Sequence, residues 1–350
     1  MVGYNAYRGR WTAQRVGKLI VTELSVKRFR ARPPAATDRV LGLAVAGGML
    51  RAAVADGRGK ILGRASEPSD NLDANGVLRR LTALASAALT AAGLTPVDIK
   101  AAGIAFGGPV DPYRGLTIFS PRSPGFEHFP LAALLEERLG IPTVLENDAR
   151  AAAFGEAVFG AARGCQTVIY VHLGTGVGGG IIVDGRLVYG AYSTAGEIGH
   201  MVVTAGGPLC SCGKPGHLEA YASEAALRAR VWEALLLSPD DPGHEFVRET
   251  RTVAGLFECA SRSPAIQRVV NDTIQMLGLA IATLIATLNP EAVIIGGPMA
   301  EAGNALLDPL QARIRQFAYP ASLQRVRVTL AELGADAPVV GAVALALARS

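Results

Sequence analysis

The chain has 350 residues, half of them hydrophobic, and can therefore bury a large core in two domains or in one large one. Residues 1–39 contain nine Lys and Arg against two acidic residues, so this segment carries +7 and the remaining chain −3 of the net +4. Because the positive charge belongs to the N-terminal segment, a basic nucleic-acid-binding surface on the body of the protein is excluded. The spacing of the four cysteines excludes a disulfide scaffold.

Residues 1–38 form a basic N-terminal extension that ends in a Pro-rich linker, RARPPAATD, at residues 30–38. The simplest interpretation is a solvated or loosely docked tail. A nucleic-acid-binding arm and an organelle transit peptide are the alternatives. The segment lacks the apolar core of a secretory signal, so we expect a soluble, cytoplasmic protein.

The first half of the body alternates between strands and helices. A strand over 39–47 leads through a turn into a hairpin whose bend is at 56–59. A helix over 72–93 and a strand within 99–110 follow, and the strand ends in a Gly-Gly-Pro turn. The pattern then predicts a helix ending at Gly140, a strand at 143–148 and a helix at 149–162. This alternation of strands and helices along the chain predicts an α/β protein.

The second half begins with the same order of elements. A strand, a Gly-rich turn, a second strand and a hairpin occupy 167–188, and helices are predicted at 225–237, 252–260 and 266–288. The apolar part of the last of these helices, Met276–Asn289, has about 14 residues and is too short for a membrane span. A strand at 290–297 and a closing helix at 339–349 complete the chain. The strand–turn–strand unit thus occurs twice, which predicts two lobes around a ligand cleft.

Four potential metal ligands lie within eighteen residues: His200, Cys210, Cys212 and His217. Thiolate sulfur and imidazole nitrogen are the ligands of closed tetrahedral Zn²⁺ sites, and the glycines between them allow tight turns. The sequence therefore predicts a structural zinc site. The alternative is two buried cysteines and two unrelated histidines.

This motif, ExGHxxxxxxxxxCxCGxxGxxE, resembles that of the ROK family, which comprises repressors, open reading frames and sugar kinases. The resemblance covers Arg39 to the C-terminus and implies the actin-like ATPase (RNase H-like) fold and a homodimer. It implies a small lobe of residues 39–147 and 335–350, and a large lobe of residues 148–334 that contains the zinc-binding loop. In the family the last ligand is usually cysteine, and here it is His217.

The sequence LENDARAAAFGE places Asn147 and Asp148 at the end of a strand, before a helix. A carboxylate in this position can accept a hydroxyl proton, and the resemblance implies that Asp148 is the catalytic base. The alternative role for Asp148 is the N-cap of the helix. The resemblance further implies a set of sugar-binding residues: Asn147, Glu197, His200, Glu219 and Gly108.

Two glycine-rich turns match the phosphate-binding loops of the family. The second, LGTGVGGG, implies nucleotide binding at Gly174, Thr175, Gly176 and Gly178, with Gly297 near the adenosine. The first retains Gly47 but is otherwise degenerate. Where the family kinases read approximately D-x-G-G-T-K, this chain has Ala44, Gly48 and Met49. Losing that aspartate removes a group that would hold hydrated Mg²⁺ near the transferred phosphate.

These residues predict an ATP-dependent kinase of a hexose or an N-acetylhexosamine, with Mg²⁺ and ATP as cofactors. The alternative is a non-catalytic sugar-sensing protein or transcriptional regulator of the same family, because such regulators often have a degenerate first loop. A DNA-binding protein that acts through residues 1–38 is the third possibility. The partners we expect are a small sugar and a nucleotide. We do not expect the protein to bind a membrane or a nucleic acid.

Overall fold

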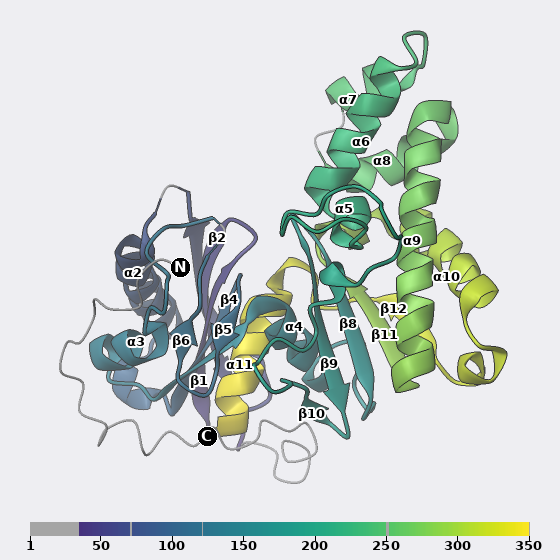
Figure 1. Ribbon diagram of the computed structural model, residues 1–350. Coiled ribbons are helices and arrows are strands. Elements are labelled where there is room, and N and C mark those ends of the chain that lie inside the picture. The colour runs from purple at the N-terminus through teal and green to yellow at the C-terminus, as the bar shows by residue number, and fades with distance from the viewer. Residues whose placement is uncertain (1–34, 71, 121, 250–251, 350) are drawn as a thin grey trace, which may run out of the picture.

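The computed structural model describes residues 35–349 except 71, 121 and 250–251. Most of the predicted N-terminal extension therefore lies outside the described residues. The described chain is an α/β structure with two five-stranded sheets and a small hairpin (Figure 1). The hairpin consists of β5 (Val110–Asp111) and β6 (Leu116–Thr117).

The first sheet has the strand order β3–β2–β1–β4–β7. Its strands are β1 (Arg39–Ala46), β2 (Met49–Asp56), β3 (Ile61–Pro68), β4 (Ala101–Phe106) and β7 (Thr143–Asn147). The first three form an antiparallel meander, and β4 and β7 run parallel to β1. Two helices, α2 (Ala74–Ala92) and α3 (Leu131–Leu139), close the core on one side of this sheet. Both end at a left-handed glycine, Gly93 and Gly140, as helices commonly do.

The second sheet repeats this topology, with the order β10–β9–β8–β11–β12. Its strands are β8 (Val168–Leu173), β9 (Val177–Val183), β10 (Arg186–Leu187), β11 (Ala292–Gly296) and β12 (Arg327–Leu330). In both sheets the first three strands form a meander, and the fourth pairs in parallel with the first. The predicted internal repeat is thus confirmed at the level of topology.

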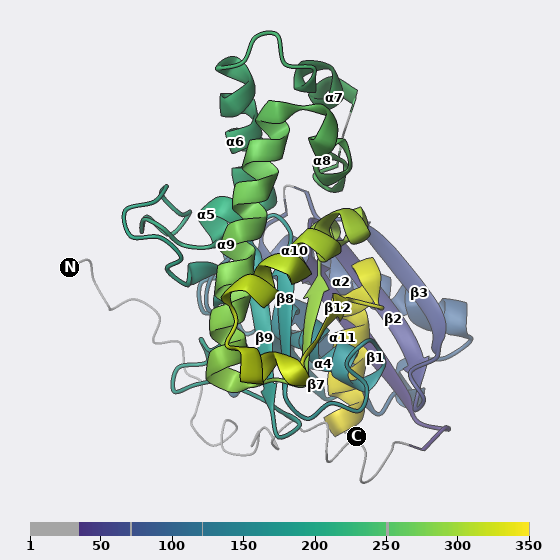
Figure 2. The same ribbon diagram turned by 90° about the vertical axis from the view of Figure 1, so that its right-hand side faces the viewer.

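The helices of the second half pack on this sheet and extend beyond it (Figures 1 and 2). They are α5 (Glu219–Ala222), α6 (Glu224–Leu236), α7 (Gly243–Glu249), α8 (Ala254–Cys259), α9 (Pro264–Leu288) and α10 (Asn304–Phe317). By length and composition α9 could cross a membrane, but 61% of its most apolar window is buried inside the protein. This burial is typical of a core helix and agrees with the sequence interpretation.

Two alanine-rich helices, α4 (Asp148–Val158) and α11 (Ala337–Arg349), lie between the two sheets (Figure 1). They cross at very short range, because a Cβ atom on Gly341 would lie only 2.0 Å from the carbonyl oxygen of Ala151. The same helix α11 approaches β4, where a Cβ atom on Gly103 would lie 2.1 Å from the carbonyl oxygen of Ala342. The C-terminal helix therefore packs on the first sheet, and α4 connects that sheet to the second.

Candidate functional site

The carboxyl end of β7 continues directly into α4 through Asn147. Its side-chain oxygen accepts hydrogen bonds from the backbone N–H groups of Ala149 and Arg150, both at 3.1 Å. Its side-chain nitrogen donates to the carbonyl oxygen of Gly108 at 3.2 Å. Asn147 is thus the N-cap, and Asp148 is the first residue of the helix. The alternative interpretation of Asp148 as the N-cap is wrong.

The carboxylate of Asp148 lies at the edge where the parallel strands of the first sheet end. A Cβ atom on Gly107 would be 3.2 Å from Oδ2 of Asp148 and 3.1 Å from the carbonyl oxygen of Val45, the residue before the end of β1. Burial raises the pKa of the Asp148 carboxyl above its ordinary value, while His172 and a hydrogen bond from the N–H of Ala149 act in the opposite direction. Such an environment favours proton uptake by this group.

The first glycine-rich turn is a two-residue hairpin between β1 and β2. Gly47 and Gly48 have φ angles of 60° and 75°, and Ala46 pairs with Met49. Two successive positive φ angles define a turn that strongly favours glycine. Ala44, at the aligned position of the family aspartate, is fully buried in the core between the sheets.

The second glycine-rich turn connects β8 to β9 and carries Gly174, Thr175 and Gly176. Two hydrogen bonds to residues outside the hairpin hold the conformation of this turn. The N–H of Val177 donates to Oε2 of Glu219 at 3.0 Å, and the N–H of Glu224 donates to the carbonyl oxygen of Gly174 at 2.8 Å. Thr175 at the tip is exposed, so its backbone and hydroxyl are accessible to a ligand.

Two further predicted nucleotide residues flank this turn. Gly178 lies on β9, and a Cβ atom there would be 3.1 Å from the Cβ of Ala149 on α4. Gly297 follows β11 with a φ of 88°, and a Cβ atom there would be 2.4 Å from the carbonyl oxygen of Leu173. The structure therefore brings the ends of β8 and β11 together beside the start of α4.

The predicted metal ligands converge. One donor atom from each of four side chains lies within 4.8 Å of all the others: His200, Cys210, Cys212 and His217. The sulfur of Cys210 is 3.6 Å from Nδ1 of His200, and the sulfur of Cys212 is 3.2 Å from Nδ1 of His217. Ligand atoms of a tetrahedral zinc site are roughly 3.4–3.8 Å apart, so the arrangement is close to that geometry.

The loop with these ligands is joined to the predicted sugar-binding residues. His200 belongs to the short helix η3 (Ile198–His200), which exposed Glu197 directly precedes. Glu219 begins α5, and its Oε1 accepts a hydrogen bond from the hydroxyl of Ser211 at 2.5 Å. Glu219 thus contacts both the Cys/His loop and the second glycine-rich turn.

Glu146, the residue before Asn147, forms a buried ion pair with Arg150 that was not predicted from the sequence. Nε of Arg150 is 2.7 Å from Oε1 of Glu146, and the two side chains are 3% and 1% exposed. Nη1 of Arg150 also donates to the carbonyl oxygen of Ser193 at 2.7 Å, in the loop that leads to Glu197. The guanidinium lies 5.5 Å from the centre of the Tyr189 ring. The i, i+4 spacing of a glutamate and an arginine was the available signal.

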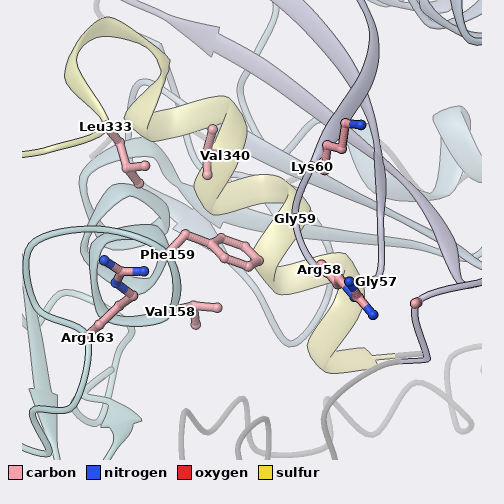
Figure 3. Close-up of a pocket in the computed structure, with 10 residues that line it drawn as sticks. Gly57, Arg58, Gly59, Lys60, Val158, Phe159, Arg163, Leu333 and Val340 are labelled. Carbon is pink, nitrogen blue, oxygen red and sulfur yellow. The ribbon is translucent and has the colours of Figure 1, made fainter.

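A separate pocket of about 800 Å³ lies at the other end of α4 (Figure 3). Phe159 and Val340 line it, together with the β2–β3 turn. The charged ends of Arg58, Lys60 and Arg163 point in different directions and do not converge on a common point (Figure 3). This pocket contains none of the predicted site residues.

Comparisons with known proteins identify the family of the chain. A family model described as the ROK family matches residues 40–349. A glucokinase from Halalkalibacterium halodurans is 38% identical over 225 residues, covering 62% of this chain and 67% of the relative. A xylose repressor from Caldicellulosiruptor bescii is 30% identical over 278 residues, covering 79% of this chain and 69% of the relative.

The solved structures include a ROK family glucokinase from Streptomyces griseus in complex with glucose and AMPPNP. It matches the present fold with a TM-score of 0.76 and 32% identity, covering 88% of this chain and 99% of that chain. This similarity confirms the predicted actin-like α/β fold. Given the match over residues 40–349, the chain belongs to the ROK family.

Proposed function

We propose that this protein transfers the γ-phosphoryl group of ATP to a hydroxyl group of a hexose or an N-acetylhexosamine. The observation that carries the proposal is the position of Asp148, whose carboxyl has a raised pKa and lies where β1, β4 and β7 end. Ligands of open α/β sheets bind at this edge. The similarity to glucokinases supports the same reaction class.

The reaction would proceed by direct displacement. Asp148 accepts the proton of the sugar hydroxyl, whose oxygen forms a bond to the γ-phosphorus. The bond between that phosphorus and the β–γ bridging oxygen breaks, and ADP leaves with the electron pair. Asp148 then loses its proton to solvent. The contribution of the protein is mainly the positioning of the two substrates and the stabilisation of developing charge.

The binding residues remain proposals and fall into two groups. The sugar would contact Asn147, Glu197, His200, Glu219 and Gly108. The phosphates would lie on the backbone of the two hairpins, and the nucleotide would contact Gly174, Thr175, Gly176, Gly178, Gly47 and Gly297. Backbone N–H groups in glycine turns form such anion sites.

Magnesium would enter as the complex with ATP and would neutralise part of the phosphate charge. The first hairpin supplies no carboxylate for it, because Ala44 is a buried core residue. The residues of this hairpin therefore do not fit a protein-bound Mg²⁺, and no step of the proposed reaction depends on one.

The donor set of the Cys/His loop fits Zn²⁺, and we propose a structural ion held by His200, Cys210, Cys212 and His217. Because Nδ1 of His200 faces Cys210, Nδ1 would be the metal ligand and Nε2 would be the atom that contacts the sugar. A metal in this position would fix the orientation of the imidazole.

A non-catalytic sugar sensor or transcriptional regulator is the second candidate function. The replacement of the family aspartate by buried Ala44 favours it, as does the similarity to a xylose repressor. A sensor would bind a sugar with an affinity that survives Asp148→Asn and would show no turnover.

The wider properties of the protein also remain proposals. The division into a small lobe (39–147 and 335–350) and a large lobe (148–334) is supported by the packing of α11 on β1 and β4. We also propose a cytoplasmic homodimer that binds neither membranes nor nucleic acid.

The kinase proposal is tested by mass spectrometry of the sugar after incubation with Mg-ATP. A phosphorylated sugar should form with the wild type and not with Asp148→Asn.

A further inference from the structure

His172 lies between the predicted catalytic base and the second phosphate-binding turn. It is the penultimate residue of β8 and pairs with Gly178 on β9 and with Gly296 on β11. Both neighbours are glycines, so neither paired residue places a side chain beside the imidazole. The side chain is half-buried.

The Tyr170 hydroxyl is the hydrogen-bonding partner of one nitrogen of His172. Nδ1 lies 3.4 Å from the hydroxyl of Tyr170, two residues earlier on the same face of the strand. Burial raises the pKa of the Tyr170 phenol far above its ordinary value, so the hydroxyl keeps its proton and is able to donate it to Nδ1. Burial also lowers the pKa of His172, which favours the neutral ring. In the tautomer whose Nδ1 accepts from Tyr170, the single ring proton is on Nε2.

The Nε2 atom is directed at the phosphate-binding turn. A Cβ atom on Gly174, the first residue of the turn, would lie only 2.9 Å from Nε2. On the other side, a Cβ atom on Gly178 would touch the Cβ of His172 at 3.9 Å and that of Ala149 at 3.1 Å. The charges of Asp148 and His172 each affect the pKa of the other group.

The imidazole therefore combines three features of a ligand-contacting group. It contacts a fully buried partner, its Nε2 faces the turn beside Asp148, and in the tautomer that accepts from Tyr170 this nitrogen is the single donor. The first hairpin, with Ala46, Gly47, Gly48 and Met49, offers no side-chain donor for a phosphate. A fixed donor aimed at developing charge is one of the most effective ways to accelerate phosphoryl transfer.

We propose that His172 is a catalytic residue whose Nε2–H, oriented by Tyr170, donates a hydrogen bond to an oxygen of the transferred phosphoryl group. This role rests on the proposed kinase function. In this role a side chain on β8 supplies a hydrogen-bond donor for the phosphate, which the side chains of the first hairpin cannot supply.

The test compares two substitutions of similar polarity. In His172→Gln the amide nitrogen reaches the position of Nε2, whereas in His172→Asn the amide reaches only the position of Nδ1. We expect His172→Asn to lower kcat by roughly a hundredfold with KM for the sugar changed by less than about twofold. His172→Gln should recover at least a tenth of the wild-type kcat, and Tyr170→Phe should give an intermediate loss. Melting temperatures of all variants identify any general folding defect.

The outcomes separate this inference from the kinase proposal. If the wild type turns over and the two His172 variants lose activity equally, or neither loses it, the inference is wrong. If the wild type turns over no sugar, the kinase proposal fails, and the dissociation constant of Mg-AMPPNP becomes the readout. Binding at least fivefold weaker in His172→Asn than in His172→Gln would then support a phosphate contact. Equal affinity, or no binding by the wild type, would overturn it.

Discussion

Glu219, which follows the Cys/His loop, accepts a hydrogen bond from the backbone N–H of Val177 at 3.0 Å, at the end of the second glycine-rich turn. The other carboxylate oxygen accepts from the hydroxyl of Ser211, which lies between Cys210 and Cys212. A single side chain thus links the proposed metal site to the start of β9. A change in the conformation of the Cys/His loop should therefore also change the conformation of the second glycine-rich turn.

Replacing Glu219 should weaken both sugar and nucleotide use. Glu219→Ala removes a charge-assisted hydrogen bond to the turn, which we expect to lower kcat/KM for ATP by roughly tenfold or more. Steady-state kinetics with varied ATP measures this effect. Glu224→Ala is the matched control, because its contact with Gly174 uses a backbone N–H that alanine keeps. Similar losses in both variants would argue against the specific role of the Glu219 carboxylate.

Metal analysis of the purified protein should give about one zinc per chain. Cys212→Ser should reduce the zinc content and lower the melting temperature by roughly 5 °C or more, because the loop would lose the ion that stabilises it. Ser211→Ala, one residue away, should keep the zinc. Folded wild-type protein that contains no zinc, isolated without chelators, would disprove the metal site.

Asp148→Asn should abolish turnover and stabilise the folded protein at neutral pH. Burial raises the pKa of Asp148 in the folded state, so the ionised carboxylate destabilises the fold above that pKa, and this cost disappears as the pH falls through it. A neutral amide avoids the cost at every pH. Thermal unfolding at pH 7 and at lower pH should show a higher melting temperature for the variant, with a difference that narrows on acidification.

The same raised pKa should appear in the kinetics. As the pH is lowered, kcat/KM should decrease, because the protonated carboxyl cannot accept the hydroxyl proton. The midpoint of this decrease should lie at a pH higher than 3.8, the ordinary pKa of aspartate. Activity retained in Asp148→Asn, or a melting temperature well below that of the wild type, would contradict the assignment.

The buried pair of Arg150 and Glu146 should be important for stability. Arg150→Met leaves Glu146 as an uncompensated buried charge, and we expect a loss of about 3–5 kcal/mol in the free energy of unfolding. Urea unfolding measures this loss, and the double substitution Glu146→Gln/Arg150→Met should recover most of it. In the more exposed pair of Arg80 and Glu67, Arg80→Met should cost about 1 kcal/mol or less. Equal losses from Arg150→Met and Arg80→Met would show that burial of the pair is irrelevant.

Much of the fold follows from local sequence patterns. The helix that ends at Gly140 and the strand that begins at Thr143 were predicted and confirmed, because glycine caps and apolar periodicity are local signals. The helix α10 and the strand β12 were not predicted. Pro309 interrupts the pattern of α10. The strand β12 has only four residues at the edge of the sheet, of which Arg327 is exposed and the others are partly buried.

The site was accessible from the sequence only where its residues are adjacent along the chain or within one loop. The four Cys and His residues belong to one segment, and the structure brings their donor atoms together. The orientation of His172 by Tyr170 could not be read from the sequence, since it depends on which face of β8 meets α4. The contact of Arg150 with Ser193 joins residues 43 positions apart and has no local pattern.

The most direct test of the proposed function is ADP release with Mg-ATP over a panel of glucose, mannose, fructose, N-acetylglucosamine and N-acetylmannosamine. The proposed function predicts sugar-dependent turnover with at least one of them, lost in Asp148→Asn, which would show that Ala44 is tolerated in an active kinase. No turnover with any sugar, together with saturable binding of one of them by calorimetry in the same preparation, would contradict the kinase and identify a sugar sensor.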